Sequence, residues 1–265
     1  MAENSKISWT THTFNPWIGC SKVSPACRLC YAMMLMAVRY GRVEWGPGKP
    51  RSRTSNGNWK KVRSWDRQAA KDGTRPRVFC ASLADWLDHE VPIEWLADLL
   101  ELIRTTTHLD WLLLTKRPEQ WRARLEAVCE IDGDSIAWSW LKGNAPANVW
   151  FGFSAEDAGW FDWRWNYVKH IPARVVFCSN EPSLGRLVLP ADFLALGSKA
   201  WVINGGESGH GCQPMDEAHP TETLRQCQEA GVPFWMKQMG GAVDSRHELS
   251  DIPEHLRVRQ LPIAT

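Results

Sequence analysis

The run VVFCSN at residues 175–180 decides how this chain is expected to fold. Four apolar residues are followed by a serine and an asparagine, and the run has the length of one buried strand. Continuous apolar runs are typical of parallel sheets, because helices cover both faces of such sheets. Five other runs have the same character: RVFCAS (77–82), WLLLT (111–115), VWFGFS (149–154), WVINGG (201–206) and PFWMK (233–237).

The spacing of these runs predicts repeated strand–helix units. Their starts recur every 26–38 residues, about the length of one βα unit. Amphipathic stretches at 92–105, 118–128 and 221–230 stand between them. With the segment near Trp17 as a further strand, we expect six or seven units in one domain spanning residues 1–265. The predicted fold class is α/β, a parallel (βα)6-type barrel, partial or complete, with its chemistry at the carboxyl ends of the strands.

The composition is ordinary for a globular protein, with 44% hydrophobic and 23% charged residues, and it argues against disorder. No window of about 18 residues is apolar throughout, so we expect no transmembrane helix and no membrane partner. Residues 1–14 lack a basic start followed by an apolar core, so we expect no signal peptide and a cytoplasmic location. The polar tail at 242–265 is expected to cap the barrel.

The net charge of +1 conceals a strongly basic segment. Residues 39–77 carry 12 Lys or Arg and 3 Asp or Glu, which gives +9 and leaves −8 for the rest of the chain. The segment also contains Trp45, Trp59 and Trp65. Basic side chains interleaved with aromatic rings suit a polyanion whose bases can stack, so nucleic acid is the expected partner of this insertion. The alternative is a solvated insertion without a ligand.

Three of the eight cysteines, Cys20, Cys27 and Cys30, are clustered in NPWIGCSKVSPACRLCYAMM (15–34). Three thiolates from one loop can hold three irons of a [4Fe–4S] cluster and leave the fourth iron open for a ligand. Zinc held by three Cys and one His, with His12 the nearest candidate, is an alternative. Three ordinary cysteines without a metal are the third possibility. A three-Cys loop after the first strand of a parallel barrel is the arrangement of radical S-adenosylmethionine (SAM) enzymes.

The opening SWTTHTFNPWIGCSKVSPACRLCYA (8–32) resembles that of the phage-associated three-Cys-motif proteins, a family of unknown function regarded as radical-SAM-like. The resemblance continues in order through nearly the whole chain, in VFCASLADWLD (78–88), LLLTKRPEQW (112–121), VWFGFSAED (149–157), CSNEPSLGRL (178–187), WVINGGESGHGCQPM (201–215) and VPFWMKQMGG (232–241). Seven colinear segments are more specific than the cysteine spacing alone. One departure is that radical SAM enzymes usually show C-x3-C-x2-C with an aromatic before the last Cys, whereas here the first gap is six residues and Leu29 takes that place.

The resemblance implies a barrel that binds a [4Fe–4S] cluster through Cys20, Cys27 and Cys30, together with SAM. In such enzymes the open iron binds the amino and carboxylate groups of SAM. One-electron reduction then breaks a carbon–sulfur bond and yields a 5′-deoxyadenosyl radical, which takes hydrogen from the substrate. The implied electron donor is a protein such as a flavodoxin or ferredoxin.

Polar residues at the strand ends are the candidate ligands of SAM and of the substrate. The expected cofactor-binding residues are Ser82, Asp85, Ser154, Glu156, Asn180, Gly205, Gly206 and Glu207. Asp85 stands where the superfamily often places a motif for the SAM amino group, and its alternative role is a helix N-cap. Glycines allow close backbone approach to a ligand, and a tight structural turn is their alternative role.

The expected catalytic residues are Lys116, Glu181 and Lys237. Lys116 is a candidate partner for the SAM carboxylate or for a substrate phosphate, with a surface salt bridge as the alternative. Glu181 precedes Pro182, which favours an extended backbone at a turn. Lys237 ends the last strand and is expected to face the substrate.

The expected function is that of a radical SAM enzyme that modifies or rearranges a DNA nucleobase or a base-linked group of a phage, in the host cytoplasm. The residues do not choose between isomerase, lyase and transferase chemistry. The alternative from another class is a zinc- or cluster-containing nucleic-acid-binding protein without turnover. A radical SAM enzyme for a small metabolite is the third possibility.

Overall fold

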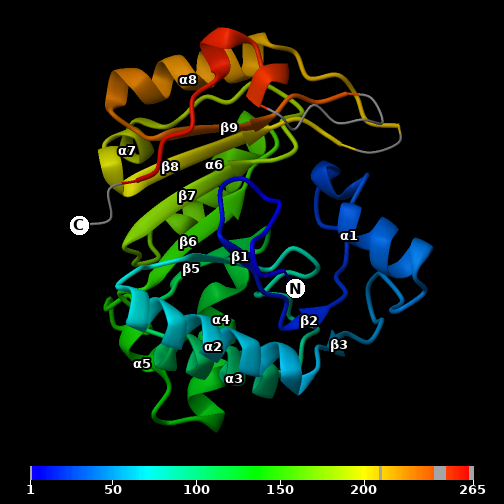
Figure 1. Cartoon of the computed structure of the whole chain (residues 1–265), viewed down its shortest axis with the longest axis vertical. Helices are drawn as coiled ribbons and strands as arrows, with labels where there is room; N and C mark the ends of the chain where they lie inside the picture. The colour runs from blue at the N-terminus through cyan, green and yellow to red at the C-terminus, as the bar shows by residue number, and fades with distance from the viewer. Residues whose placement is uncertain (1, 209–210, 242–248, 263–265) are drawn as a thin grey trace. The chain divides into compact units, whose positions relative to one another are not determined.

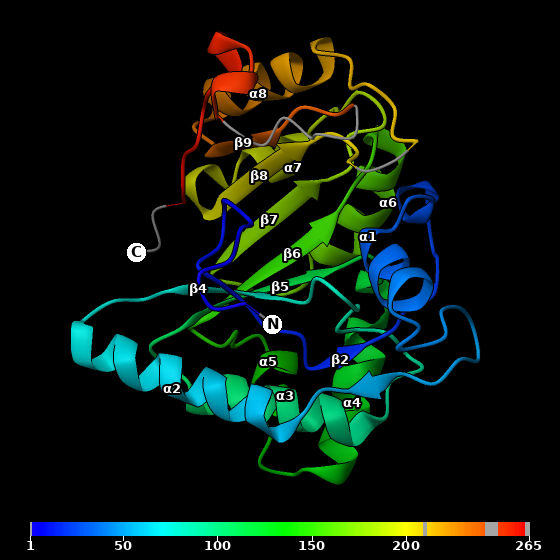
Figure 2. The same cartoon turned by 45° about the vertical axis from the view of Figure 1, so that its right-hand side comes forward.

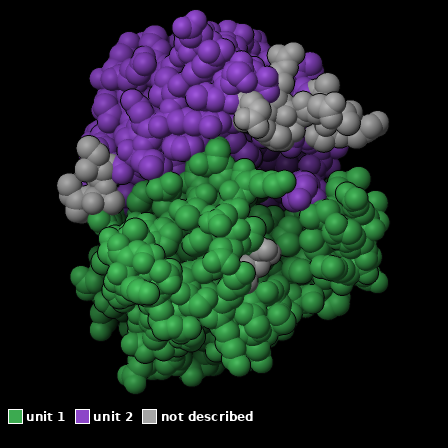
Figure 3. Space-filling model, viewed as in Figure 1, with its two compact units in different colours: residues 1–22, 32–151, 171–174 green, residues 23–31, 152–170, 175–265 purple. Residues whose placement is uncertain are grey.

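The computed structural model describes residues 2–208, 211–241 and 249–262. The chain divides into two compact units, which Figure 3 shows in green and purple. Unit 1 consists of residues 1–22, 32–151 and 171–174, and unit 2 of residues 23–31, 152–170 and 175–265. The three-Cys segment is divided between them, because Cys20 belongs to unit 1 whereas Cys27 and Cys30 belong to unit 2.

The main sheet has the strand order β1-β4-β5-β6-β7-β8-β9. The pairings β1–β4, β4–β5, β7–β8 and β8–β9 are all parallel. These strands follow one another in chain order, without the reversal of a doubly wound sheet, so the predicted parallel α/β class is confirmed. The six predicted runs correspond to six strands: β4 (Arg77–Cys80), β5 (Asp110–Thr115), β6 (Val149–Ser154), β7 (Val175–Asn180), β8 (Ala200–Gly205) and β9 (Phe234–Gln238).

The first strand of the main sheet differs from the prediction. The sequence placed it near Trp17, but Trp17–Ile18 (β2) pairs antiparallel with Ser52–Arg53 (β3) in a separate two-stranded sheet. The main sheet begins with β1, His12–Thr13, beside β4. Pro16 explains the difference, because it has no N–H to donate and the ladder of β1 cannot continue through it.

The longer helices of unit 1 are α2 (Asn56–Asp72), α3 (Ile93–Thr105), α4 (Trp121–Ile131) and α5 (Ile136–Leu141). Two of them, α3 and α4, correspond to the predicted amphipathic stretches 92–105 and 118–128, whereas α2 and α5 were not predicted. The predicted stretch 92–105 is α3, and Leu96, Leu99 and Ile103 on its inner face are fully buried. A short helix, α1 (Tyr31–Met33), begins directly after Cys30 and continues as a π-helix over Met34–Arg39.

The basic segment 39–77 forms α2 over much of its length. This helix lies alongside α3 in both views of Figures 1 and 2, and Arg63 Nη1 donates to Thr105 Oγ1 at 2.9 Å. Trp65 stacks on His12 with ring centroids 4.3 Å apart, and Trp59 is also buried. Neither tryptophan ring is available for stacking with bases, which removes one ground for expecting nucleic acid here.

The α-helices in the described part of unit 2 are α6 (Ala158–Val168), α7 (Ala191–Leu194) and α8 (Ala218–Ala230). The predicted stretch 221–230 is therefore most of α8, and it ends before Gly231, which adopts φ +67° as a left-handed cap. The rings of Phe153, Phe161, Trp165 and Phe193 meet with centroids 5.1–6.5 Å apart and fill the core beside α6.

The chain after β9 returns along that strand. Met236 N donates to Val258 O at 2.8 Å, Gln260 N donates to Phe234 O at 2.9 Å, and Trp235 forms an antiparallel bridge with Arg259. Of the tail expected to cap the barrel, 242–248 and 263–265 lie outside the described residues. Within the described ranges, no helix is long and apolar enough to span a membrane.

Candidate functional site

The predicted site residues are divided between the two units. Unit 1 holds Cys20, Ser82, Asp85 and Lys116. Unit 2 holds the others: Cys27, Cys30, Ser154, Glu156, Asn180, Glu181, Gly205, Gly206, Glu207 and Lys237.

Asp85 is a buried carboxylate in the loop after β4. Its Oδ1 accepts from Thr115 Oγ1 at 2.7 Å and from Leu87 N at 3.0 Å. Its Oδ2 accepts from Lys116 N at 2.8 Å and from Arg117 Nη1 at 3.4 Å. Both oxygens are thus engaged by the chain itself, so in this arrangement Asp85 connects the β4 loop to the end of β5.

Arg117, which lies just after β5 in unit 1, was not among the predicted site residues. Its guanidinium is almost fully buried, and Nη1 lies 3.3 Å from the Cys20 thiol. Nη2 donates to the backbone oxygen of Ser21 at 2.9 Å and to its Oγ at 2.8 Å. Burial raises the pKa of Cys20 to about 11, although the charge of Arg117 acts in the opposite direction. One buried cation at the end of β5 therefore fixes the first cysteine of the motif.

Ser82 and Lys116 are both half-buried at the ends of β4 and β5. Ser82 Oγ accepts from Asn15 Nδ2 at 3.1 Å, and Asn15 Oδ1 accepts from Leu83 N at 2.8 Å. These contacts join the loop after β1 to the loop after β4. The prediction that Ser82 and Lys116 contact a cofactor or substrate stays a prediction.

Glu156 in unit 2 forms a fully buried ion pair just after β6. Its Oε2 accepts from Arg164 Nη1 at 2.7 Å, and neither side chain is exposed. Its Oε1 accepts from the backbone N–H of Ala26 at 3.3 Å. Burial by itself raises the pKa of Glu156, but the Arg164 charge and the donors around it hold the pKa below its ordinary value. Glu156 therefore secures the residue just before Cys27.

Glu207 holds the residue on the other side of Cys27. Arg28 Nη2 donates to Glu207 Oε2 at 3.0 Å, and the carboxylate is only 4% exposed. The same oxygen accepts from Gln213 N at 3.2 Å. Cys27 thus lies between two residues that are each bound by a buried carboxylate, one after β6 and one after β8.

Glu181 and Lys237, two of the predicted catalytic residues, are in contact. Lys237 Nζ lies 2.6 Å from Glu181 Oε1, and Ser179 Oγ donates to Glu181 Oε2 at 3.1 Å. The pair is partly exposed, with 27% of the Lys237 side chain accessible. The carboxyl ends of β7 and β9 thus present an ammonium and a carboxylate side by side, which can bind a polar ligand or transfer a proton.

Gly205, the last residue of β8, and Gly206 just after it both lie close to other parts of unit 2. A Cβ on Gly206 would lie 2.2 Å from the Cα and N of Gly240, a distance no side chain tolerates. A Cβ on Gly205 would lie 3.1 Å from Glu181 Oε1. The close backbone approach expected at Gly206 is therefore made by Gly240.

The remaining predicted residues of unit 2 are buried at the same strand ends. Asn180 Nδ2 donates to Ala155 O at 2.6 Å, and Asn180 Oδ1 accepts from Asn204 Nδ2 at 2.7 Å. Ser154 is buried, and its carbonyl accepts from Arg164 Nη1 at 2.8 Å. Sequence reasoning missed Asn204, although an asparagine closing an apolar strand run was the available signal.

Three buried acceptors near the ends of β8 and β9 have no partner within the described residues. They are Asn204 Oδ1, Glu207 Oε1 and Gln238 Oε1. Each belongs to a residue that is at least nine-tenths buried. An unsatisfied buried acceptor costs free energy, so three of them in one unit favour a ligand or water that brings N–H or O–H donors.

All eight cysteines carry free thiols. Among the described residues, no three His, Cys, Asp or Glu side chains are gathered as a ready metal site. The ligand set Cys20, Cys27 and Cys30 stays a prediction.

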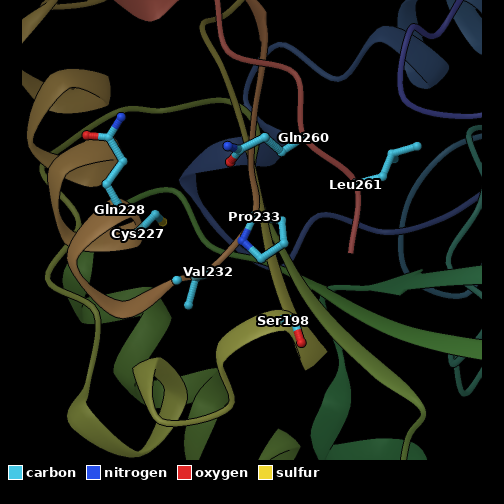
Figure 4. A pocket seen from close by; sticks show the side chains of 8 residues that line it. Ser198, Cys227, Gln228, Val232, Pro233, Gln260 and Leu261 are labelled. Carbon is cyan, nitrogen blue, oxygen red and sulfur yellow. The ribbon is translucent and has the colours of Figure 1, made fainter. Parts of the chain in front are cut away.

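Unit 2 also has an open cavity of about 360 Å³. In Figure 4, Cys227 and Gln228 border it from α8, while Val232 and Pro233 border it from the chain just before β9. Ser198 precedes β8. The cavity therefore lies at the amino ends of β8 and β9, away from the polar residues at their carboxyl ends.

Comparison with known proteins identifies a family whose function is unknown. No curated protein and no solved structure matches the chain. A family described as "Protein of unknown function (DUF5131)" matches residues 4–259. Because this match spans nearly the whole chain, the protein belongs to the DUF5131 family.

Proposed function

We propose that this protein is a radical SAM enzyme that acts on a nucleic-acid base or a base-linked group. The proposal combines the resemblance of the sequence to the radical-SAM-like three-Cys-motif proteins with one structural observation. Residues at strand ends hold the cysteine motif on both sides. Arg117 binds Cys20 in unit 1, and Glu156 and Glu207 bind the two neighbours of Cys27 in unit 2.

The donor set suits the proposed cluster and its ligand. Cys20, Cys27 and Cys30 are free thiols in one short stretch, which is the type of ligand that iron–sulfur clusters use. When bound and reduced, such a cluster supplies the electron that cleaves SAM to a 5′-deoxyadenosyl radical. The unpartnered acceptors Glu207 Oε1 and Gln238 Oε1 suit a ligand with an amino group and hydroxyls, as SAM has.

In this proposal the chain's residues bind, orient and handle protons. Glu207 and Gln238 accept hydrogen bonds from SAM, and Lys237 offers its ammonium to a carboxylate or phosphate. Glu181 holds Lys237 in place through the 2.6 Å contact. Burial of Glu207 and Gln238 strengthens their contacts, because surroundings of low polarity screen charge weakly.

The test is an anaerobic reconstitution with iron and sulfide, followed by SAM and dithionite, with 5′-deoxyadenosine as the readout. Cys27→Ala is the test variant, and Cys129→Ala, which alters a buried thiol of α4 outside the motif, is its matched control. We expect product from the wild type and from Cys129→Ala, and none from Cys27→Ala. A colourless protein with one bound zinc would refute the proposal and favour the nucleic-acid-binding protein without turnover.

A further inference from the structure

Part of the basic charge of residues 39–77 is neutralised by ion pairs within unit 1. Five of its cations pair with carboxylates: Lys49 with Glu44, Arg51 with Asp88 and Glu90, Arg53 with Asp98, Lys61 with Glu3, and Arg75 with Asp110. Arg51 is fully buried in its ion pair. Five of the twelve cations of the segment therefore belong to ion pairs of the fold, and the question is which of the others are exposed on one face.

Four exposed cations of α2, Lys60, Arg63, Arg67 and Lys71, have no carboxylate within 4.0 Å in the part of the chain that the structure describes, and Arg63 donates instead to Thr105 Oγ1. We call the other three, Lys60, Arg67 and Lys71, the α2 stripe. At 100° per residue they fall within an arc of about 40° on the helix, and at 1.5 Å per residue they span about 16 Å. Val62 and Ala69 lie on the opposite, buried face of the same helix.

The stripe is rigidly presented. Trp59 and Trp65 anchor α2, with Trp59 edge-on to Phe14 at 5.3 Å and Trp65 stacked on His12 at 4.3 Å. Because the helix is fixed along its length, no backbone ordering is needed when a ligand binds the three cations. A row of fixed positive charges with no negative charge on it attracts a polyanion.

The residues on the exposed face of α2 indicate which kind of polyanion it can bind. Both tryptophans of α2 are buried, so the face has no aromatic platform of the kind that binds single-stranded bases. The large exposed hydrophobic residues of the protein include none from α2, so the face cannot insert into a lipid surface. What remains is contact with evenly spaced phosphates along a double helix.

We propose that the α2 stripe docks the phosphate backbone of a double-stranded nucleic acid, without reading its sequence. The inference rests on the proposed function for the role of that nucleic acid as substrate. DNA and RNA duplexes share this chemistry, and the experiment separates them.

The experiment measures the affinity of the full-length protein for a fluorescent 30-base-pair duplex as a function of salt. The test variant is Lys60→Gln/Arg67→Gln/Lys71→Gln. The control is Arg104→Gln/Arg122→Gln/Arg225→Gln, which removes the same charge from exposed arginines that have ion-pair partners on their own helices. Parallel arms use an RNA duplex, a single strand and vesicles containing phosphatidylserine. Circular dichroism verifies that each variant is folded.

Each phosphate contact contributes about 0.9 to the slope of log affinity against log salt. We expect the slope of the stripe variant to be smaller than that of the wild type by about 2.7. When salt rises from 50 to 200 mM, the affinity of the wild type should therefore fall by a factor about 40 times larger than the affinity of the variant. The control keeps the wild-type slope. The inference would be overturned if the wild type and the stripe variant had equal slopes, or if the stripe and control variants lost equal slope. It would also be overturned if the protein preferred the single strand or the vesicles to the duplexes. Formation of 5′-deoxyadenosine from SAM without nucleic acid is measured in the same samples, so failure of docking and failure of the enzyme are distinguished.

Discussion

Arg117 and Cys20 are joined by a contact of 3.3 Å between a buried guanidinium nitrogen and the thiol sulfur. Arg117 follows β5, whereas Cys20 lies 97 residues earlier in the chain. The same guanidinium holds Ser21 and Asp85, so it connects three loops of unit 1. The position of the first cysteine is therefore determined by a residue that no metal-ligand motif would include.

Arg117→Gln is expected to lower the free energy of unfolding by about 3 kcal/mol, because it leaves the buried Asp85 carboxylate without its cation. Urea unfolding measures the change. Arg122→Gln, on an exposed side chain of α4, is the matched control and is expected to change stability by less than about 0.5 kcal/mol. Similar values for the two variants would mean that the Arg117 contacts contribute little to stability.

Glu156→Gln is expected to destabilise the protein at pH 7 by about 3–5 kcal/mol, because Arg164 then stays buried and unpaired. The pKa of Glu156 is lowered in the folded state, so its contribution is present above the unfolded pKa of about 4.3 and is lost as pH falls through the folded value. The variant should therefore lose less stability than the wild type on acidification below about pH 4.3. Unfolding curves at pH 7, 4 and 3 provide the measurement, and parallel pH profiles would contradict the assignment.

Glu207→Ala is expected to release the segment around Cys27 without unfolding the protein, because Arg28 is half exposed and its ion pair contributes little to global stability. The readout is the rate at which iodoacetamide labels Cys27 and Cys30, resolved by peptide mapping. We expect faster labelling of these two thiols and an unchanged rate at Cys129. Unchanged labelling throughout would show that Glu207 does not restrain the motif.

Gly206→Ala is expected to destabilise unit 2 by about 3 kcal/mol or more, because the new Cβ would overlap the backbone of Gly240. Gly159→Ala is the matched control, since its Cβ would meet only Asp157 Oδ1 at 3.4 Å within the first turn of α6. Thermal unfolding should show a large loss for the first variant and little change for the second. If both behave like the wild type, the loop after β8 has more room than the backbone contact indicates.

Trp65→Phe tests the corrected role of the tryptophans in the basic segment. We expect a loss of stability of about 1–3 kcal/mol, because the ring is buried against His12, and an unchanged salt slope for duplex binding. The measurement is the same fluorescence titration used for the α2 stripe. A reduced slope in a folded variant would indicate that Trp65 contributes to nucleic-acid binding after all.

The sequence predicted the strands well because buried parallel strands are recognisable from their own residues. VVFCSN and VWFGFS correspond to β7 and β6 at every residue. The first strand was misplaced because a two-residue strand has no pattern, and only its pairing with β4 defines it. Trp59 and Trp65 were predicted to contact a ligand because they stand among basic residues in the sequence. The sequence does not show on which side of α2 they lie, and in the structure both are buried.

The candidate site was predictable as a set of strand-end residues but not as a set of contacts. Glu181 and Lys237 were both expected there, and the structure brings them within 2.6 Å. Arg117 and Asn204 were missed because each acts through partners far away in the chain. Gly206 was assigned to a ligand because the sequence cannot show that Gly240 occupies the space beside it.

The return of residues 258–260 along β9 affects how this protein behaves in solution. The outer strand of a sheet offers unpaired N–H and C=O groups to any other extended chain, and such edges nucleate aggregation. Here Val258 and Gln260 occupy the hydrogen-bonding groups of Phe234 and Met236. The chain thus shields its own last strand, and copies of the protein are prevented from joining sheet to sheet along that side of unit 2.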